Sequence, residues 1–177
     1  MKKITLAVIL MLVGMVVYAQ PLTLDKVNSQ LSILGTSSVH DWASIVEKFD
    51  ASATLKDNEL ANVKFEAQVK SIKSGKSGMD KNTYTALDAD HHSKISFAAS
   101  SLKIEGDKLT GNGSLTIKGK TNQIPVNLSI QQKAVYIISG EIDLKMTDYG
   151  VEPPTALLGT IKTGDTITIA ITLSLKK

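Results

Sequence analysis

The sequence contains no cysteine and no arginine, and each absence excludes a class of function. Without cysteine there is no disulfide framework, thiolate metal site, iron–sulfur cluster or cysteine nucleophile. Without arginine the chain lacks the planar, two-point donor for phosphate and guanine, so we expect no nucleic-acid partner. Aromatic residues make up only 5% of the 177 residues, and 20 lysines face 17 acidic side chains. This composition is typical of one ordinary globular domain and is too apolar for a disordered tail.

The first 19 residues have the pattern of a secretory signal peptide. Lys2 and Lys3 precede an apolar run over residues 4–17, and Val17 and Ala19 are small residues placed before a break. The alternative is an uncleaved anchor, but this run is shorter than the roughly 20 residues that a spanning helix needs. No cysteine follows Ala19, which excludes a lipoprotein anchor. We therefore expect a signal peptide over 1–19, one mature domain over 20–177, and a periplasmic or secreted product.

Most of the mature chain alternates apolar and polar residues with a period of two, which is typical of β-strands. The clearest run covers 166–175, and similar runs cover 63–70, 124–131 and 141–146. Short turn signals separate the runs, at 57–58, 106–107, 119–120, 139–140 and 164–165. We therefore predict an all-β fold in one domain, an antiparallel meander of about eight or more strands. Closing such a meander into a barrel removes its exposed sheet edges.

Two stretches break the alternation, residues 74–93 and 148–163. In the first, Met79 to Leu87 has helical spacing of its apolar residues, which predicts a short helix. We expect this helix to lie across one mouth of the barrel as a lid or plug. The second stretch contains glycine and a proline pair and is expected to be irregular.

The three histidines do not form a metal site by spacing. Asp88-Ala89-Asp90-His91-His92 contains two adjacent histidines, which point in different directions on an extended chain, and no third ligand completes the set. We expect no metal here and interpret the segment as a polar loop, in which Asp90 caps or turns the chain before the next strand.

Val39-His40-Asp41-Trp42 contains the single tryptophan of the chain. His40 and Trp42 share one face of a strand, which Asp41 opposes. One interpretation is a corner at which Trp42 plugs a barrel end and Asp41 satisfies turn amides; the other is that His40 and Trp42 contact a ligand.

No catalytic signature accompanies these residues. Gly-rich phosphate loops, Gly-x-Ser-x-Gly and His-Glu-x-x-His are all missing. Residues 37–41 are too close together to converge as a triad on one strand. We expect no enzyme and no cofactor; a hydrolase or isomerase built on His40 and Asp41 is the remaining enzyme alternative.

Four segments carry a family resemblance. Leu115-Thr116-Ile117-Lys118-Gly119-Lys120-Thr121 resembles the strand-turn-strand motif of the YceI-like family of exported bacterial lipid-binding domains. Leu24–Ser29 resembles the family's opening motif, Asp80 with Lys94–Phe97 a middle block, and Asp148–Val151 a late motif. Together they cover nearly the whole mature chain. This chain departs from the family at Asn28, where many members have histidine, and at Met79 and Met146, where arginine is usual.

The resemblance implies an eight-stranded, lipocalin-like antiparallel barrel around a hydrophobic tunnel for a long isoprenoid or fatty chain. Small barrels can hold one apolar ligand. The function that follows is transport, storage or stress protection. The alternative is a structural or surface-interaction barrel with a filled core and no ligand, which the low aromatic content favours. A homodimer is left open.

Two groups of candidate ligand-binding residues follow. Alternation does not say which face is inside, so the wall residues are assigned as one face of each strand. The tunnel walls are assigned to Phe65, Val69, Phe97, Ile117, Leu128, Leu144, Ile169 and Leu173. The mouth is assigned to His40, Trp42, Met79, Asp80, Met146, Asp148 and Tyr149; the alternative for the two methionines is that they are ordinary core residues. Loops on a rigid barrel often carry specificity, so we expect residues 79–92 and 148–158 to lie near one another and gate ligand access.

Overall fold

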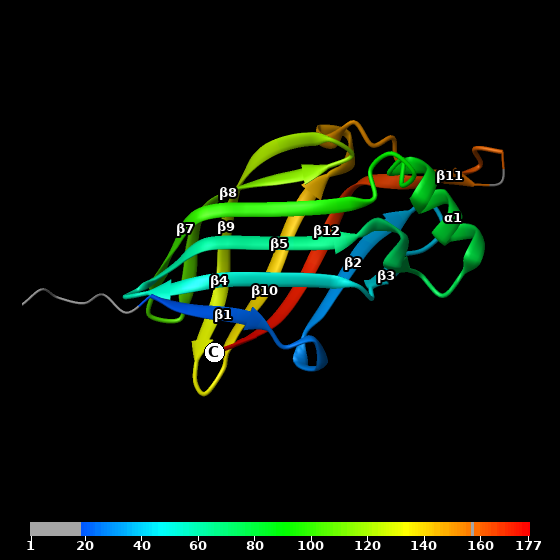
Figure 1. The fold of residues 1–177 in the computed structure, drawn as a ribbon. Coiled ribbons are helices and arrows are strands. Elements are labelled where there is room, and N and C mark those ends of the chain that lie inside the picture. Colours follow the sequence, from blue (N-terminus) through cyan, green and yellow to red (C-terminus); the bar gives the residue numbers. More distant parts are fainter. Residues whose placement is uncertain (1–18, 157) are drawn as a thin grey trace, which may run out of the picture.

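The computed structural model describes residues 19–156 and 158–177, so the predicted signal peptide, apart from Ala19, lies outside the described residues. Strands dominate the described part, with one α-helix, α1 (Ser77–Ala86), and three short 3-10 helices (Figure 1). The strands are β1 (Gln20–Leu24), β2 (Gln30–Ser37), β3 (Trp42–Val46), β4 (Phe49–Lys56), β5 (Glu59–Gln68), β6 (Ile72–Lys73), β7 (Lys94–Glu105), β8 (Lys108–Ile117), β9 (Lys120–Gln132), β10 (Tyr136–Lys145), β11 (Thr155–Ala156) and β12 (Ile161–Lys176). Across the described ranges, we find no helix with the length and apolar character to cross a membrane.

The first six strands behave as three long strands, each interrupted once. The 3-10 helix η1 (Lys26–Asn28) separates β1 from β2, and η2 (Val69–Ser71) separates β5 from β6. Because β1 pairs with β4 and β2 with β3, the two interrupted strands lie side by side along their whole length. With β7, β8, β9, β10 and β12 they make eight long antiparallel strands.

The last strand closes the barrel against the first. β12 pairs with β10 on one side and with both β2 and β1 on the other, where Thr23 faces Lys176 and Leu24 faces Leu175. Ser29 strengthens this closure, because its Oγ accepts a hydrogen bond from the Ser174 N–H at 2.9 Å. The prediction of a closed, eight-stranded antiparallel barrel with one helix near a mouth is confirmed.

Two of the predicted turns are wrong. Residues 139–140 lie inside β10 and residues 164–165 lie inside β12. Gly140 has a φ of +150°, and a Cβ at this position would lie 2.8 Å from Leu128 Cδ2, so this glycine marks a close approach to β9. Gly164 lies in an irregular stretch of β12, between its pairings at Thr163 and Ile167. The turn between β9 and β10 instead uses residues 133–135.

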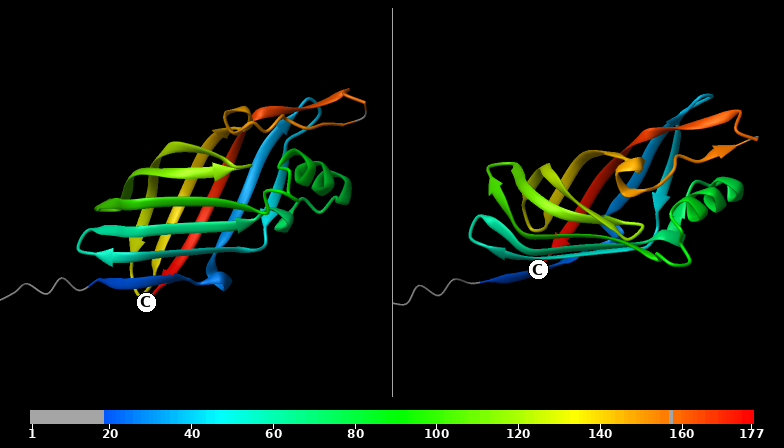
Figure 2. Two further views of the ribbon diagram at one scale, coloured as in Figure 1. Left: turned by 45° about the horizontal axis from the view of Figure 1, so that its top comes forward. Right: turned by 90° about the horizontal axis from the view of Figure 1, so that it is seen from above.

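The two ends of the barrel differ. The half of the barrel that carries the turns at 57–58, 106–107 and 133–135 contains a continuous apolar core, and we call it the closed half. At the other end, which we call the mouth, α1, the β2–β3 turn and the segment around β11 lie together (Figures 1 and 2). The half of the barrel next to the mouth is the open half.

The wall of the open half has a gap in its hydrogen-bond ladder. β9 and β10 pair over four residue positions, from Gln132–Tyr136 to Ser129–Ser139. Beyond Ser139 the described strands diverge, β9 staying with β8 and β10 with β12 (Figure 1). We call this gap the seam. The 3-10 helix η3 (Met146–Tyr149) contacts both β9 and β10 beside it.

Candidate functional site: a cavity in the open half

The open half contains a cavity of about 620 Å³. This volume is within the range of small-molecule sites, roughly 300–1,000 Å³. Strands β2, β3, β5, β7 and β12 form its walls, and α1 with residues 144–155 surrounds its mouth. The apolar wall residues include Leu31, Ile33, Val46, Ile72, Ile95, Ile161 and Ile167. None of these residues was among the predicted site residues, although the alternation in β2 and β12 indicated an apolar face that includes Ile33 and Ile167.

A second, smaller cavity of about 130 Å³ lies in the closed half. Phe65, Leu144 and Ile169 line both cavities, so these three side chains stand at the boundary between them. The two cavities therefore follow one another inside the barrel, the larger next to the mouth.

Seven of the eight residues assigned to the tunnel walls line a cavity, Leu173 among them at the smaller one, whereas Val69 is buried in η2 and lines neither cavity. Ile117 joins Phe65, Leu144 and Ile169 at the larger cavity, and Phe97 and Leu128 line the smaller one. The structure thus decides which face of each strand is inside, which the alternation left open.

The seven residues assigned to the mouth divide into two groups. His40, Trp42, Met79, Met146 and Tyr149 line the larger cavity. The two aspartates do not line either cavity.

Asp80 organises the loop that leads into α1. Its carboxylate accepts hydrogen bonds from Ser74 Oγ at 2.6 Å and from the Ser74 N–H at 2.7 Å. The Lys73 ammonium lies 3.9 Å away. The hydrogen bond from the Ser74 hydroxyl lowers the pKa of Asp80 the most, and the hydrogen bond from the Ser74 N–H lowers it further below its ordinary value. This carboxylate is turned to its own loop, because two local donors satisfy it there.

Asp148 belongs to an outer groove at the seam. Its backbone carbonyl accepts a hydrogen bond from Asn122 Nδ2 at 2.9 Å. Lys118 Nζ donates to the carbonyl of Gly150 at 3.2 Å. The strand-turn-strand motif and the late motif of the family are therefore in direct contact beside the mouth.

The late motif is a single turn that buries two side chains. Gly150 caps η3 with a φ of +67°, a conformation that favours glycine. This cap directs Tyr149 and Val151, each 3% exposed, into the apolar cluster that includes Ile117 and Leu144. Residues 79–92 and 148–158 thus both contribute to the wall of the cavity, with Leu157 outside the described residues. That they gate ligand access stays a prediction.

Tyr149 separates the cavity from the outer groove, which has a volume of about 700 Å³. Among the described residues its buried hydroxyl has no hydrogen-bond partner. Burial raises the pKa of Tyr149, an effect that the nearby Asn122 amide partly offsets. The tyrosine is held in the seam by packing, since the amide of Asn122 donates to Asp148.

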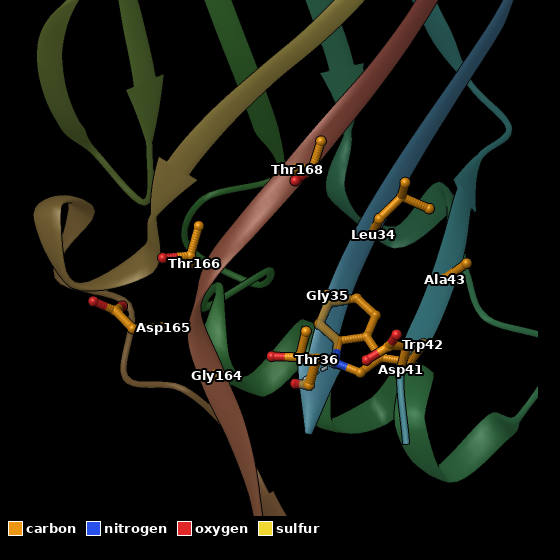
Figure 3. Close-up of a pocket in the computed structure, with 10 residues that line it drawn as sticks. All are labelled: Leu34, Gly35, Thr36, Asp41, Trp42, Ala43, Gly164, Asp165, Thr166 and Thr168. Carbon is orange, nitrogen blue, oxygen red and sulfur yellow. Dashed lines mark hydrogen bonds between the residues drawn. The ribbon is translucent and has the colours of Figure 1, made fainter. Parts of the chain in front are cut away.

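Trp42 forms part of the wall near the β2–β3 turn. Its indole lies over Gly35, where any Cβ would collide with the ring, and its Nε1 donates to the carbonyl of Thr36 at 3.0 Å. On the outside, Trp42 lines a shallow pocket with Asp41 and Asp165 (Figure 3). The indole is thus a partition between the cavity and the surface.

The β2–β3 turn is organised by Ser37. Its Oγ accepts hydrogen bonds from the N–H groups of Val39 and His40, at 3.3 and 3.2 Å. The interpretation that Asp41 satisfies these amides is therefore wrong, because both N–H groups donate to the Ser37 hydroxyl instead. The His40 ring is hydrogen-bonded through Nδ1 to the backbone carbonyl of Asp41 at 2.8 Å, so it does not use the carboxylate.

The Asp88–His92 segment is a solvated turn. His91 Nδ1 lies 2.7 Å from Asp88 Oδ1, and this contact raises the pKa of His91. Asp90 lies in the turn over residues 87–91, as one of the two expected roles required, and its carboxylate pairs with Lys70 at 2.7 Å instead of capping the backbone. Within the ranges that the structure describes, no three metal-ligating side chains come together.

Solved structures with the same fold come from several bacteria. BcnA of Burkholderia cenocepacia has a TM-score of 0.74 at 20% identity, over 85% of this chain and 98% of that one. A polyisoprenoid-binding domain from Saccharophagus degradans has a TM-score of 0.68 at 14% identity, over 88% and 97%. The YCEI protein of Campylobacter jejuni has a TM-score of 0.62 at 17% identity, over 75% and 83%. At these identities the likeness shows the fold alone.

No protein of curated function matches the chain. The profile of the YceI-like domain family matches residues 22–175, which is most of the chain and nearly all of the barrel. The residues that carried the resemblance lie inside this range, at the closure, the mouth and the seam. The chain therefore belongs to the YceI-like domain family.

Proposed function

We propose that this protein binds one long isoprenoid or fatty chain in the cavity of the open half, as a carrier or store and without catalysis. The observation that carries the proposal is the cavity of about 620 Å³ with apolar walls inside a closed barrel. Membership in the YceI-like family supports a lipid-binding role in general. The Saccharophagus degradans neighbour, described as a polyisoprenoid-binding domain, supports the isoprenoid class.

The walls explain why a chain-shaped ligand would be favoured. Ile33, Phe65, Ile95, Ile167 and Ile169 face the interior but are only half-buried, because the space beside them is not filled by protein. Covering apolar surface stabilises a complex by about 25 cal/mol per Å². A long apolar chain can cover all these side chains at once, and the smaller cavity behind Phe65 can accept its end.

The rival interpretation, a barrel with a filled core, describes the closed half only. There Leu22, Leu60, Leu109 and Ile130 are at most 1% exposed. The open half retains a cavity of ligand size, which a purely structural barrel does not need.

The proposal includes export. The pattern over residues 1–19 supports it, and β1 begins at Gln20, directly after the expected cleavage site. N-terminal sequencing of the protein from a periplasmic or secreted fraction should begin at Gln20. A chain that begins at residue 1 and stays with the membrane would contradict export.

Native mass spectrometry of freshly isolated 20–177 protein, with lipid extraction, tests the binding proposal. We expect bound lipid, and uptake of added farnesol or hexadecanoate by protein that has been stripped. The variant Ile33→Trp places an indole in the cavity and should reduce uptake strongly, because Ile33 lines the wall. The matched control is Leu34→Trp, on the same strand but 37% exposed on the outer face. An empty barrel that refuses both probes, or equal uptake by both variants, would overturn the proposal.

A further inference from the structure

Lysines are the charged residues at the mouth of the apolar cavity. Lys76 and Lys81 border the cavity from the start of α1, and Lys145 borders it from the end of β10. No aspartate or glutamate of the described chain lines the cavity. Lys76 and Lys81 are exposed, and neither makes an ion pair in the described ranges. This asymmetry contrasts with the balanced charge of the whole chain.

The carboxylates on the segments around the mouth are engaged elsewhere or lie outside. Asp80 accepts both hydrogen bonds of Ser74. Asp165 accepts from the N–H and the hydroxyl of Thr147, at 2.9 and 2.7 Å. Asp41 lies at the outer pocket (Figure 3), and Glu152 is exposed and does not line the cavity.

Lys145 differs from the other two lysines. It also borders the outer groove at the seam, where Asp143 and Asp148 lie. Its charge is therefore countered on the outer side, whereas Lys76 and Lys81 have no carboxylate beside them in the lining of the cavity.

From these observations, and resting on the proposed function, we infer that the mouth selects amphiphiles with an anionic head group, a carboxylate or a phosphate. The apolar chain would enter the cavity, and the head group would stay at the mouth within reach of Lys76 and Lys81. Flexible lysine stems present ammonium groups as point charges without requiring a fixed geometry. His40 borders the same cavity from the β2–β3 turn and adds a ring nitrogen to the polar lining.

The test compares ligands that share a chain and differ in the head group. Stripped 20–177 protein is titrated with hexadecanoate against hexadecanol, and with farnesyl phosphate against farnesol. We expect the anionic member of each pair to bind about three- to tenfold more tightly, since the lysines are exposed and each pair contributes modestly. The preference should fall at roughly 1 M salt, where the screening length is about 3 Å. A preference in one pair alone identifies which anion, carboxylate or phosphate, the mouth accepts.

The double variant Lys76→Gln/Lys81→Gln should lose this preference and keep the affinity for the neutral alcohols. Lys108→Gln/Lys133→Gln is the matched control, because it removes the same charge at the closed end, where both lysines are exposed. Equal binding of anionic and neutral members by the unmodified protein would overturn the inference and leave lipid binding intact. Failure of all four ligands to bind would instead overturn the proposed function. If both double variants lose the preference equally, overall charge and not the mouth is responsible.

Discussion

The closed and open halves of the barrel share several of the same strands, yet the closed half leaves a cavity of only about 130 Å³ and the open half one of about 620 Å³. In the closed half, leucines and isoleucines from facing strands meet in one continuous core. In the open half the interior side chains surround a cavity of about 620 Å³. β12 runs through both, with Leu175 buried in the core and Ile167 half-buried at the cavity.

The wall differs between the halves as well. The closed half has a continuous hydrogen-bond ladder across β9 and β10, whereas this ladder is missing in the open half beyond Ser139. In the open half η3 lies against both strands instead, and the Asn122 side chain on β9 donates a hydrogen bond to the Asp148 carbonyl of η3. We infer that the closed half supplies most of the stability, because in the open half a cavity takes the place of packed side chains.

Truncating one isoleucine in each half is the strongest test of this comparison. Ile130 is 1% exposed in the closed core, so Ile130→Ala should lower the free energy of unfolding by about 2–5 kcal/mol. Ile167 already borders a cavity, so Ile167→Ala should cost about 1 kcal/mol. Urea unfolding of the two variants measures both values. Equal losses would mean that the two halves are packed alike.

A pair of glycines beneath aromatic rings gives a second test. A Cβ at Gly113 would collide with the Phe97 ring inside the barrel, and one at Gly35 would collide with the Trp42 indole at the mouth. Gly113→Ala should cost about 1–3 kcal/mol, because the surrounding core cannot move. Gly35→Ala should cost less, because the indole can turn outward, and the fluorescence of this single tryptophan should shift to longer wavelength. An unshifted spectrum with a large loss of stability would show that the mouth is as rigid as the core.

The pH dependence of Asp80 tests how firmly α1 is attached at the mouth. Its folded-state pKa lies below the ordinary value, so its contribution is present above about pH 4 and is lost as the pH falls through the folded pKa. Asp80→Asn should lower stability by about 1 kcal/mol at pH 7. The difference from the unmodified protein should shrink in unfolding curves recorded near pH 3. A difference that is independent of pH would show that the charge of Asp80 does not stabilise the loop.

Removing the Tyr149 hydroxyl should have the smallest effect. The hydroxyl is buried with no partner among the described residues, so Tyr149→Phe should leave stability unchanged or raise it by up to about 0.5 kcal/mol. Thermal unfolding measures the change, with Tyr136→Phe in the closed core as the matched control for a loss of one tyrosine hydroxyl. A clear destabilisation by Tyr149→Phe would mean that the hydroxyl has a partner in solution, with Asn122 the nearest candidate.

Local patterns in the sequence were sufficient for the strands, the helix and the family. The period-two alternation at 166–175 and 124–131 indicates a strand, because successive side chains of a strand face opposite sides. This holds for any neighbour that the strand packs against. The helical spacing from Met79 to Leu87 predicted most of α1. The mouth residues His40, Trp42, Met79, Met146 and Tyr149 came from motifs and are brought together at one cavity.

Only the tertiary structure decided the rest, because it depends on contacts between residues far apart in the chain. Gly140 and Gly164 looked like turns, but one lies against Leu128 and the other against Thr36, which are brought near by strand pairing. Asp80 looked like a polar contact for a ligand until the loop supplied Ser74 as its partner. Which face of each strand is inside, how much of the interior is filled, and where lysines gather without acids are properties of the closed barrel, since closure alone brings these distant side chains around one space.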